Sequence, residues 1–211
     1  GLIALAGVGM CVAALIALSR RDLRERLAYS CMAQSLAVVI GALVALPMGL
    51  FAAALQIVAL ACAATTLSMA VGTSAAITTR RNVEDYVGLG RVMPWTFAGF
   101  ALASASMIGM PPFSGAWAKL WLITALGAPG GDLLWAAALV GVAAVLTFAH
   151  LGPLAASALS GKAPTDAFKR PDGASILLAA PVILAAAATL SLLVFADPLA
   201  RFLSPIWQAG S

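Results

Sequence analysis

The chain has 211 residues, of which 63% are hydrophobic and only 9% are charged, and its formal net charge is +4. A soluble domain carries roughly a quarter charged residues. Apolar runs long enough to cross a bilayer recur along the whole sequence, so composition excludes a soluble globular protein and predicts an all-α integral membrane protein. Because the charges are confined to short clusters between apolar runs, the positive charge indicates membrane topology and not nucleic-acid binding.

The apolar runs predict six transmembrane spans, the fourth of them a broken helix, within one transmembrane domain over 1–211. In chain order the runs are Gly1–Ser19, Leu27–Leu46 closed by Pro47, Leu50–Ile77, the pair Val92–Met110 and Phe113–Leu126, Leu133–Leu159, and Ile176–Phe195. The first run lacks a signal-peptidase site and is interpreted as a span. Because the sequence starts inside that run with Gly1, we expect it to be part of a longer protein.

The distribution of Lys and Arg favours six spans over seven. Ten of the twelve basic residues fall in three loops, namely Arg20, Arg21, Arg24 and Arg26, then Arg80, Arg81 and Arg91, then Lys162, Lys169 and Arg170. If the paired apolar blocks form one interrupted span, all three loops face the same side, which the positive-inside rule makes the cytoplasm. The interpretation is a multi-pass protein of a bacterial-type inner membrane, with both termini outward and Trp95, Trp135 and Trp207 near span boundaries.

The interruption is the sequence GMPPFSGAWAKLWLI, which starts at Gly109. A straight helix over Val92–Leu126 would be about 52 Å long, whereas the hydrocarbon core is about 30 Å thick. Pro111 and Pro112 lack backbone donors, so carbonyl groups freed at the break need partners from the protein or from water. Broken helices at membrane depth recur at transport sites.

Lys119 lies within two turns of the double proline, on the helix face opposite Trp117 and Trp121. A lysine at the bilayer centre costs roughly 2.5–3.5 kcal/mol, so we expect the side chain to face the bundle interior. The sequence predicts a small hydrated cavity with Lys119 as its titratable wall and the broken backbone, from Gly109 to Gly115, as the other wall. The alternative is that Lys119 extends to the outer surface as an anchor.

Three motifs carry a resemblance to a known family. DLRERLAYSCMAQ (Asp22–Gln34) is similar to D-L-K-R-x-L-A-Y-S-x-x-S-Q, and VGLGRVMPWT to G-L-G-R-x-M-P-W-T, which G-x-P-P-x-S-G-F-x-x-K follows. FAHLGPL (Phe148–Leu154) resembles Y-Y-L-R-P-L. Together they resemble the antiporter-like membrane subunits of respiratory complex I and of Mrp-type multisubunit cation/proton antiporters, and the D-type antiporter subunit most closely.

The resemblance implies a fold and a set of site residues. The family contains two inverted five-helix repeats, each with a broken helix, and this chain resembles the second repeat, over about 1–160. A final span and tail, over about 175–211, would follow it. The family's lysine on the second broken helix falls on Lys119, and the cytoplasmic loop motif falls on Asp22, Arg24 and Tyr29. Gly109, Pro111, Pro112 and Gly115 form the break.

The chain also departs from the family pattern. The third span aligns with a family helix that carries two histidines and a lysine, and those positions are Gln56, Leu60 and Ala64 here. His150, the only histidine in the sequence, stands where the family has an aromatic residue. It is interpreted either as a proton relay to Lys119 or as a neutral, hydrogen-bonded replacement, so the candidates for a proton path are Lys119, His150 and Gln56.

Two functions remain open from sequence. The first is a proton-conducting, antiporter-like subunit of a larger complex, with a degraded proton path. The second is a transport-inactive structural or accessory subunit of a respiratory or photosynthetic assembly. The sequence shows no catalytic constellation, metal site or cofactor motif, and Cys11, Cys31 and Cys62 are interpreted as buried apolar residues. The expected partners are other membrane subunits and lipids.

Overall fold

The computed structural model describes residues 1–78, 82–128, 130, 132–161, 182–184 and 186–187. Its principal helices are α1 (Leu2–Ser19), α2 (Leu23–Leu43), α3 (Pro47–Thr78), α4 (Pro94–Ile108), α5 (Ser114–Gly127) and α6 (Leu134–Ser160). Two short 3-10 helices, η1 (Val83–Tyr86) and η2 (Leu89–Arg91), lie between α3 and α4. The prediction of an all-α membrane protein is confirmed for this part of the chain, in which α1, α2, α3 and α6 are long and apolar enough to cross a membrane.

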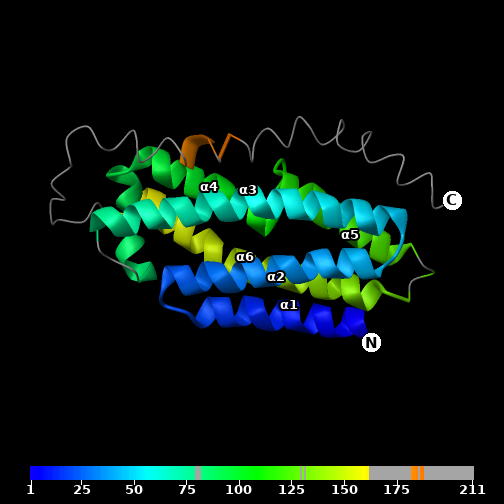
Figure 1. Cartoon of the computed structure of the whole chain (residues 1–211). Helices are drawn as coiled ribbons and strands as arrows, with labels where there is room; N and C mark the ends of the chain where they lie inside the picture. Colours follow the sequence, from blue (N-terminus) through cyan, green and yellow to red (C-terminus); the bar gives the residue numbers. More distant parts are fainter. Residues whose placement is uncertain (79–81, 129, 131, 162–181, 185, 188–211) are drawn as a thin grey trace.

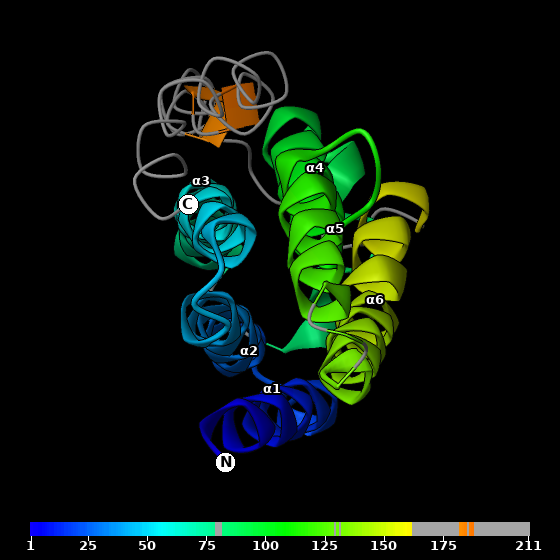
Figure 2. The ribbon, with the colours of Figure 1, turned by 90° about the vertical axis from the view of Figure 1, so that its right-hand side faces the viewer.

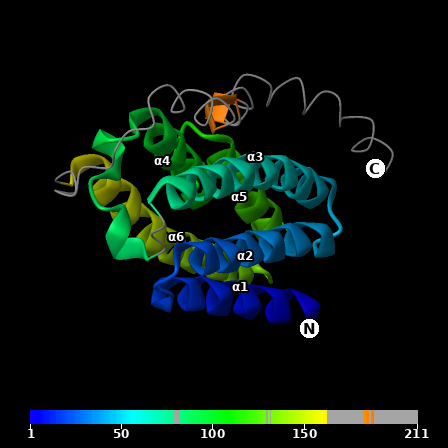
Figure 3. The ribbon, with the colours of Figure 1, turned by 60° about the vertical axis from the view of Figure 1, so that its left-hand side comes forward.

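The helices α4 and α5 are two short helices in the region where one interrupted span was predicted. With 15 and 14 residues they are about 22 Å and 21 Å long, and each is too short to cross a hydrocarbon core of about 30 Å. Figures 1 and 3 show them running one after the other across the bundle, and the end view in Figure 2 shows them in line. The predicted helix break is therefore present, and that α4 and α5 cross the membrane as one interrupted span remains a prediction.

The loops rich in arginine meet at one end of the bundle, which we call the basic end. The Val83 N–H donates to the Arg21 carbonyl oxygen at 2.9 Å, and the Gly88 N–H donates to the Ser157 carbonyl oxygen near the end of α6 at 3.1 Å. The link between α1 and α2, the described part of the loop between α3 and α4, and the end of α6 therefore lie together, and the two links without arginine or lysine lie at the other end, with the N-terminus (Figure 1). The expectation that the first two basic loops share one side is confirmed.

Several predicted features lie wholly or mainly outside the described residues. These are the last span Ile176–Phe195, the basic residues Arg80, Arg81, Lys162, Lys169, Arg170 and Arg201, and Trp207. Within the last span, residues 182–184 are helical, and Val182 lies against Gly99 of α4. The count of six spans and the boundary between the repeat and the final span remain predictions.

Two predicted helix boundaries were wrong around α2. Pro47 was expected to close this span, but α2 ends at Leu43 and Pro47 begins α3. Proline is well suited to the first turn of a helix, where its missing N–H has no intrahelical partner. The start lies at Leu23, earlier than the predicted Leu27, because the Asp22 carboxylate caps the helix by accepting a hydrogen bond from the Arg24 N–H at 2.8 Å.

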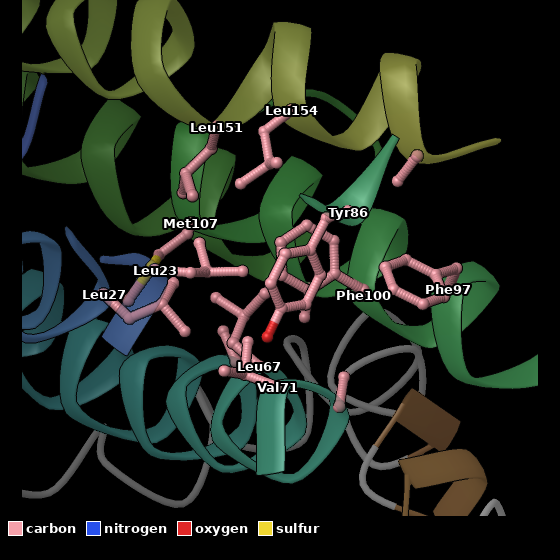
Figure 4. Packing of buried hydrophobic residues seen from close by; sticks show 14 of the residues in the cluster. Leu23, Leu27, Leu67, Val71, Tyr86, Phe97, Phe100, Met107, Leu151 and Leu154 are labelled. Atoms are coloured by element: carbon pink, nitrogen blue, oxygen red, sulfur yellow. The ribbon is translucent and has the colours of Figure 1, made fainter. Parts of the chain in front are cut away.

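The core consists of two main apolar clusters. The one near the basic end surrounds Tyr86, Phe97 and Phe100, and includes leucines from α2, α3 and α6 (Figure 4). The other joins α1, α2, α5 and α6 and is rich in alanine. Small residues allow the backbones of membrane helices to approach closely, which explains how α1 packs with a buried face of mostly Ala and Gly.

Candidate functional site at the broken helix

The break between α4 and α5 leaves carbonyl groups near the end of α4 without their helical donors, and the Met107 carbonyl is one of them. The helix α4 ends at Ile108 and is capped by Gly109, whose φ of 92° lies in the left-handed region, and the Met110 N–H donates back to the Ala105 carbonyl oxygen at 2.9 Å. In a continuous helix, the N–H of residue 111 would donate to the carbonyl of residue 107. Pro111 has no N–H, so the Met107 carbonyl needs another partner.

Lys119 supplies that partner. Its Nζ atom donates a hydrogen bond to the Met107 carbonyl oxygen at 2.7 Å, and the side chain is only 8% exposed. The amine therefore occupies the place of the backbone donor that Pro111 lacks. The expectation that Lys119 faces the bundle interior is confirmed within the described residues, and this geometry disagrees with extension to the outer surface.

The two tryptophans that flank Lys119 lie away from it, as the helical period predicts. Trp117 is 45% exposed, and the Trp121 ring packs edge-on against Phe51 of α3 with 5.6 Å between ring centroids. Together they leave the face that carries Lys119 turned toward α4.

Two glycines make room for this contact. A Cβ atom on Gly115 would collide with the carbonyl oxygen of Ser106, so only glycine lets the start of α5 lie against the end of α4. A Cβ on Gly109 would come within 2.9 Å of Lys119 Cδ. Gly109 is also the residue that adopts the left-handed conformation, for which glycine has no steric penalty. The glycines around the double proline therefore allow α4 and the start of α5 to pack closely enough for Lys119 to reach the end of α4.

A cavity of about 540 Å³ lies between the break and α6. The break contributes Gly109, Pro111 and Pro112 to its lining, and α5 contributes Lys119. From α6 the lining residues are Val140, Gly141 and Ala144. Lys119 is its charged lining residue, and the other lining side chains are apolar or aromatic. A cavity lined by Lys119 and by residues of the break was expected and is present, and its hydration remains a prediction.

The other two path candidates belong to different hydrogen-bonded groups among the described residues. The Gln56 amide donates to Gln34 Oε1 at 2.9 Å. His150 contacts Ser30 of α2, with 2.6 Å between Nε2 and Oγ. Neither has a direct hydrogen bond to Lys119. The three predicted proton-path residues therefore belong to three separate polar groups inside the bundle.

Sequence reasoning missed Ser30, Arg26 and Gln34 as site residues. They recur every four residues along α2, which places them on one face of the helix. Ser30 and Gln34 are buried polar residues of α2. The α3 position Leu60, where the family has a histidine, instead packs against the apolar cluster near the basic end. A search for polar residues at helical spacing would have found this face.

The cytoplasmic loop motif has a structural role at the basic end. Asp22 caps α2, and the Arg20 guanidinium lies over the Tyr29 ring, 5.4 Å from its centroid. Burial raises the pKa of the Tyr86 hydroxyl in the adjoining loop, and Arg24 opposes this shift. The motif therefore orders the loops around the start of α2 and lies apart from the break.

Comparison with known proteins gives the same architecture. The sequence profile of NADH:quinone oxidoreductase/Mrp antiporter transmembrane proteins matches residues 1–147. Subunit N of NADH-quinone oxidoreductase from Desulforudis audaxviator is 35% identical over 119 residues, which cover 56% of this chain and 24% of that protein. The chain thus spans about a quarter of the length of this curated relative.

Solved structures agree in fold over nearly the whole chain. A chain of the Mrp complex from Dietzia sp. DQ12-45-1b superposes with a TM-score of 0.83 at 22% identity, over 96% of this chain and 45% of that one. A chain of respiratory complex I from Thermus thermophilus gives a TM-score of 0.77 at 23% identity, over 99% and 43%. The helical bundle with its broken helix, together with the profile match, shows that this chain belongs to the NADH:quinone oxidoreductase/Mrp antiporter family of multi-pass membrane proteins.

Proposed function

We propose that this chain acts in a proton-translocating complex as part of an antiporter-like membrane subunit, and that Lys119 is its proton-carrying group. The supporting observation is the buried amine bound to the Met107 carbonyl at the helix break. An amine next to a backbone acceptor can be held either charged or neutral, because it donates a hydrogen bond in both states. The cavity beside it gives a second face from which a proton can arrive.

We also propose how the chain is oriented in the membrane and what surrounds it. The basic end faces the cytoplasm of a bacterium, since arginine and lysine are retained on that side of inner-membrane proteins. Other membrane subunits and lipids cover the outer faces, where large apolar side chains such as Leu5, Leu120 and Val145 are exposed. The relatives named above belong to such assemblies, which supports the same setting for this chain.

A structural subunit without transport is the alternative function. Its support is the third helix, where the family's titratable positions are Gln56, Leu60 and Ala64. Leu60 and Ala64 pack against an apolar cluster, so this part of the family's path contains no ionisable side chain here. We interpret the path along α3 as degraded.

Reconstitution distinguishes these functions. We expect liposomes that contain the purified chain alone to show no proton flux above empty vesicles, because an unbroken proton path across apolar helices is costly without polar partners. Liposomes that contain the assembled complex from the native membrane should show flux in response to an imposed pH gradient. A complex that is intact by mass and composition but carries no protons would support the structural function instead.

A further inference from the structure

The second polar group inside the bundle, His150 with Ser30, has the geometry of a proton-binding site. His150 lies on α6 and Ser30 on α2, and their side chains are 1% and 0% exposed. This pair joins α2 and α6 inside the bundle. It lies toward the basic end, where the Arg26 guanidinium donates to the His150 carbonyl oxygen at 3.3 Å.

The hydrogen bonds of the imidazole define its tautomer. His150 Nδ1 lies 2.8 Å from the Leu146 carbonyl oxygen, which can only accept a hydrogen bond. Nδ1 therefore carries a hydrogen. In the neutral ring, Nε2 then carries no hydrogen and its lone pair can accept a hydrogen bond. Nε2 lies 2.6 Å from the Ser30 Oγ atom.

Ser30 can serve both protonation states of the ring. Its Oγ lies 2.6 Å from His150 Nε2 and 2.8 Å from the Arg26 carbonyl oxygen, and the hydroxyl has a single hydrogen. When the ring is neutral, that hydrogen points to Nε2. When Nε2 gains a proton, the ring donates to Oγ and the hydroxyl hydrogen turns to the Arg26 carbonyl. Each state is fully hydrogen-bonded, and only one hydroxyl has to rotate.

The charges around the ring are few. The helices α1 and α4 carry no charged side chain, and Arg26 of α2 is the charged group that faces His150. The charged groups on the other described elements packed against α6 are Lys119, which is bound to Met107, and Glu84, Asp85 and Arg91 of η1 and η2. A proton at His150 therefore has Ser30 as its hydrogen-bonding partner, without a carboxylate beside it.

We propose that His150 and Ser30 bind a proton between the basic end and the bundle interior. They would form part of a proton route along α2 and α6, in place of the degraded proton path along α3. Binding adds one proton to the Nε2 lone pair, and release returns it, with no other bond made or broken. One turn further along α2, Gln34 accepts a hydrogen bond from Gln56 and continues the polar face inward. The proton-binding site stands on its own geometry, whereas the route rests on the proposed function.

Nuclear magnetic resonance of the single histidine tests the site directly. The full chain, purified without a polyhistidine tag and labelled with ¹⁵N-histidine in nanodiscs, contains one histidine signal set. We expect the Nδ1–H tautomer at high pH and reversible conversion to imidazolium on acidification. The Nε2–H tautomer at high pH, or a ring that stays neutral over the whole pH range in which the chain is folded, would overturn the site.

Serine variants show whether Ser30 takes part. Ser30→Ala removes the partner of the bound proton and should lower the midpoint of the histidine titration by about one pH unit, because Ser30 binds the charged ring more strongly than the neutral ring. Ser35→Ala is the matched control, because Ser35 is an exposed serine on the same helix whose hydroxyl donates to the Cys31 carbonyl oxygen. Equal midpoints in the two variants would show that Ser30 does not hold the proton.

Proton flux in the assembled complex then tests the route. His150→Phe keeps an aromatic ring without a titratable nitrogen and should lower flux by about 100-fold, the low end for loss of a proton-transfer group. If this variant keeps full flux while Lys119→Met abolishes it, the route is wrong and the proposed function stands. If the unmodified complex carries no protons, the proposed function fails, and the histidine titration alone decides whether the site exists.

Discussion

Replacing Lys119 by methionine should lower proton flux through the assembled complex by about 100-fold or more, the scale of losing a group that gives and takes the transferred proton. Methionine keeps the volume of the side chain but cannot ionise. The measurement is pH-gradient-driven flux in liposomes at equal protein content. Flux within twofold of the unmodified complex would show that protons pass elsewhere.

A glutamine variant separates proton transfer from structure in this experiment. Lys119→Met also removes the donor to the Met107 carbonyl, and a buried carbonyl left without a partner costs about 1–3 kcal/mol. Lys119→Gln keeps a donor of similar length without an ionisable amine. We expect both variants to lose flux and only the methionine variant to lose thermal stability. Flux restored in Lys119→Gln would mean that the hydrogen bond is what matters.

Replacing Gly115 by alanine should destabilise the helix break more than any other single methyl addition at a described glycine of α4, α5 or α6. The new Cβ would collide with the Ser106 carbonyl oxygen, which belongs to the backbone of α4 and cannot rotate away. Overpacking of this kind costs about 3 kcal/mol when the neighbour is fixed. The measurement is the apparent melting temperature of the purified chain in detergent, followed by tryptophan fluorescence.

Gly141→Ala is the matched control for this stability measurement. Gly141 lies on α6, lines the cavity beside Lys119, and has no heavy atom within 4 Å of an added Cβ. Alanine has a better helix propensity than glycine, so this variant should melt at the same temperature as the unmodified chain or higher. Equal melting of the Gly115 and Gly141 variants would contradict the close contact between α4 and α5.

Most helices were predictable because bilayer thickness fixes the length of an apolar run. The ends of α1, α3 and α6 fall within three residues of the predicted spans, and the charge pattern gave the pairing of α4 with α5. The largest difference is four residues at the start of α2, and the end of α2 and the start of α3 each differ by three residues, because local chemistry sets these boundaries. Asp22 caps the helix early, and Pro47 begins the next helix because a proline ring fits a first turn as readily as it ends a run.

The candidate site was predictable in composition and only partly in geometry. The insertion cost of a charge predicts that Lys119 points inward, and the double proline predicts an unpaired carbonyl. That the two would meet depends on the angle between α4 and α5, which no pattern in the sequence encodes. The same holds for His150 and Ser30, which are 120 residues apart and come together only when α6 packs beside α2.

The position of the Lys119 amine in an experimental structure of the assembled complex tests the central claim most directly. We expect cryo-electron microscopy density to place Nζ within hydrogen-bond distance of the Met107 carbonyl oxygen, shielded from lipid and beside the cavity along α6. Density that places the amine among the outer lipid headgroups, with the Met107 carbonyl bound to another group, would contradict this account. The lysine would then be an anchor at the membrane surface.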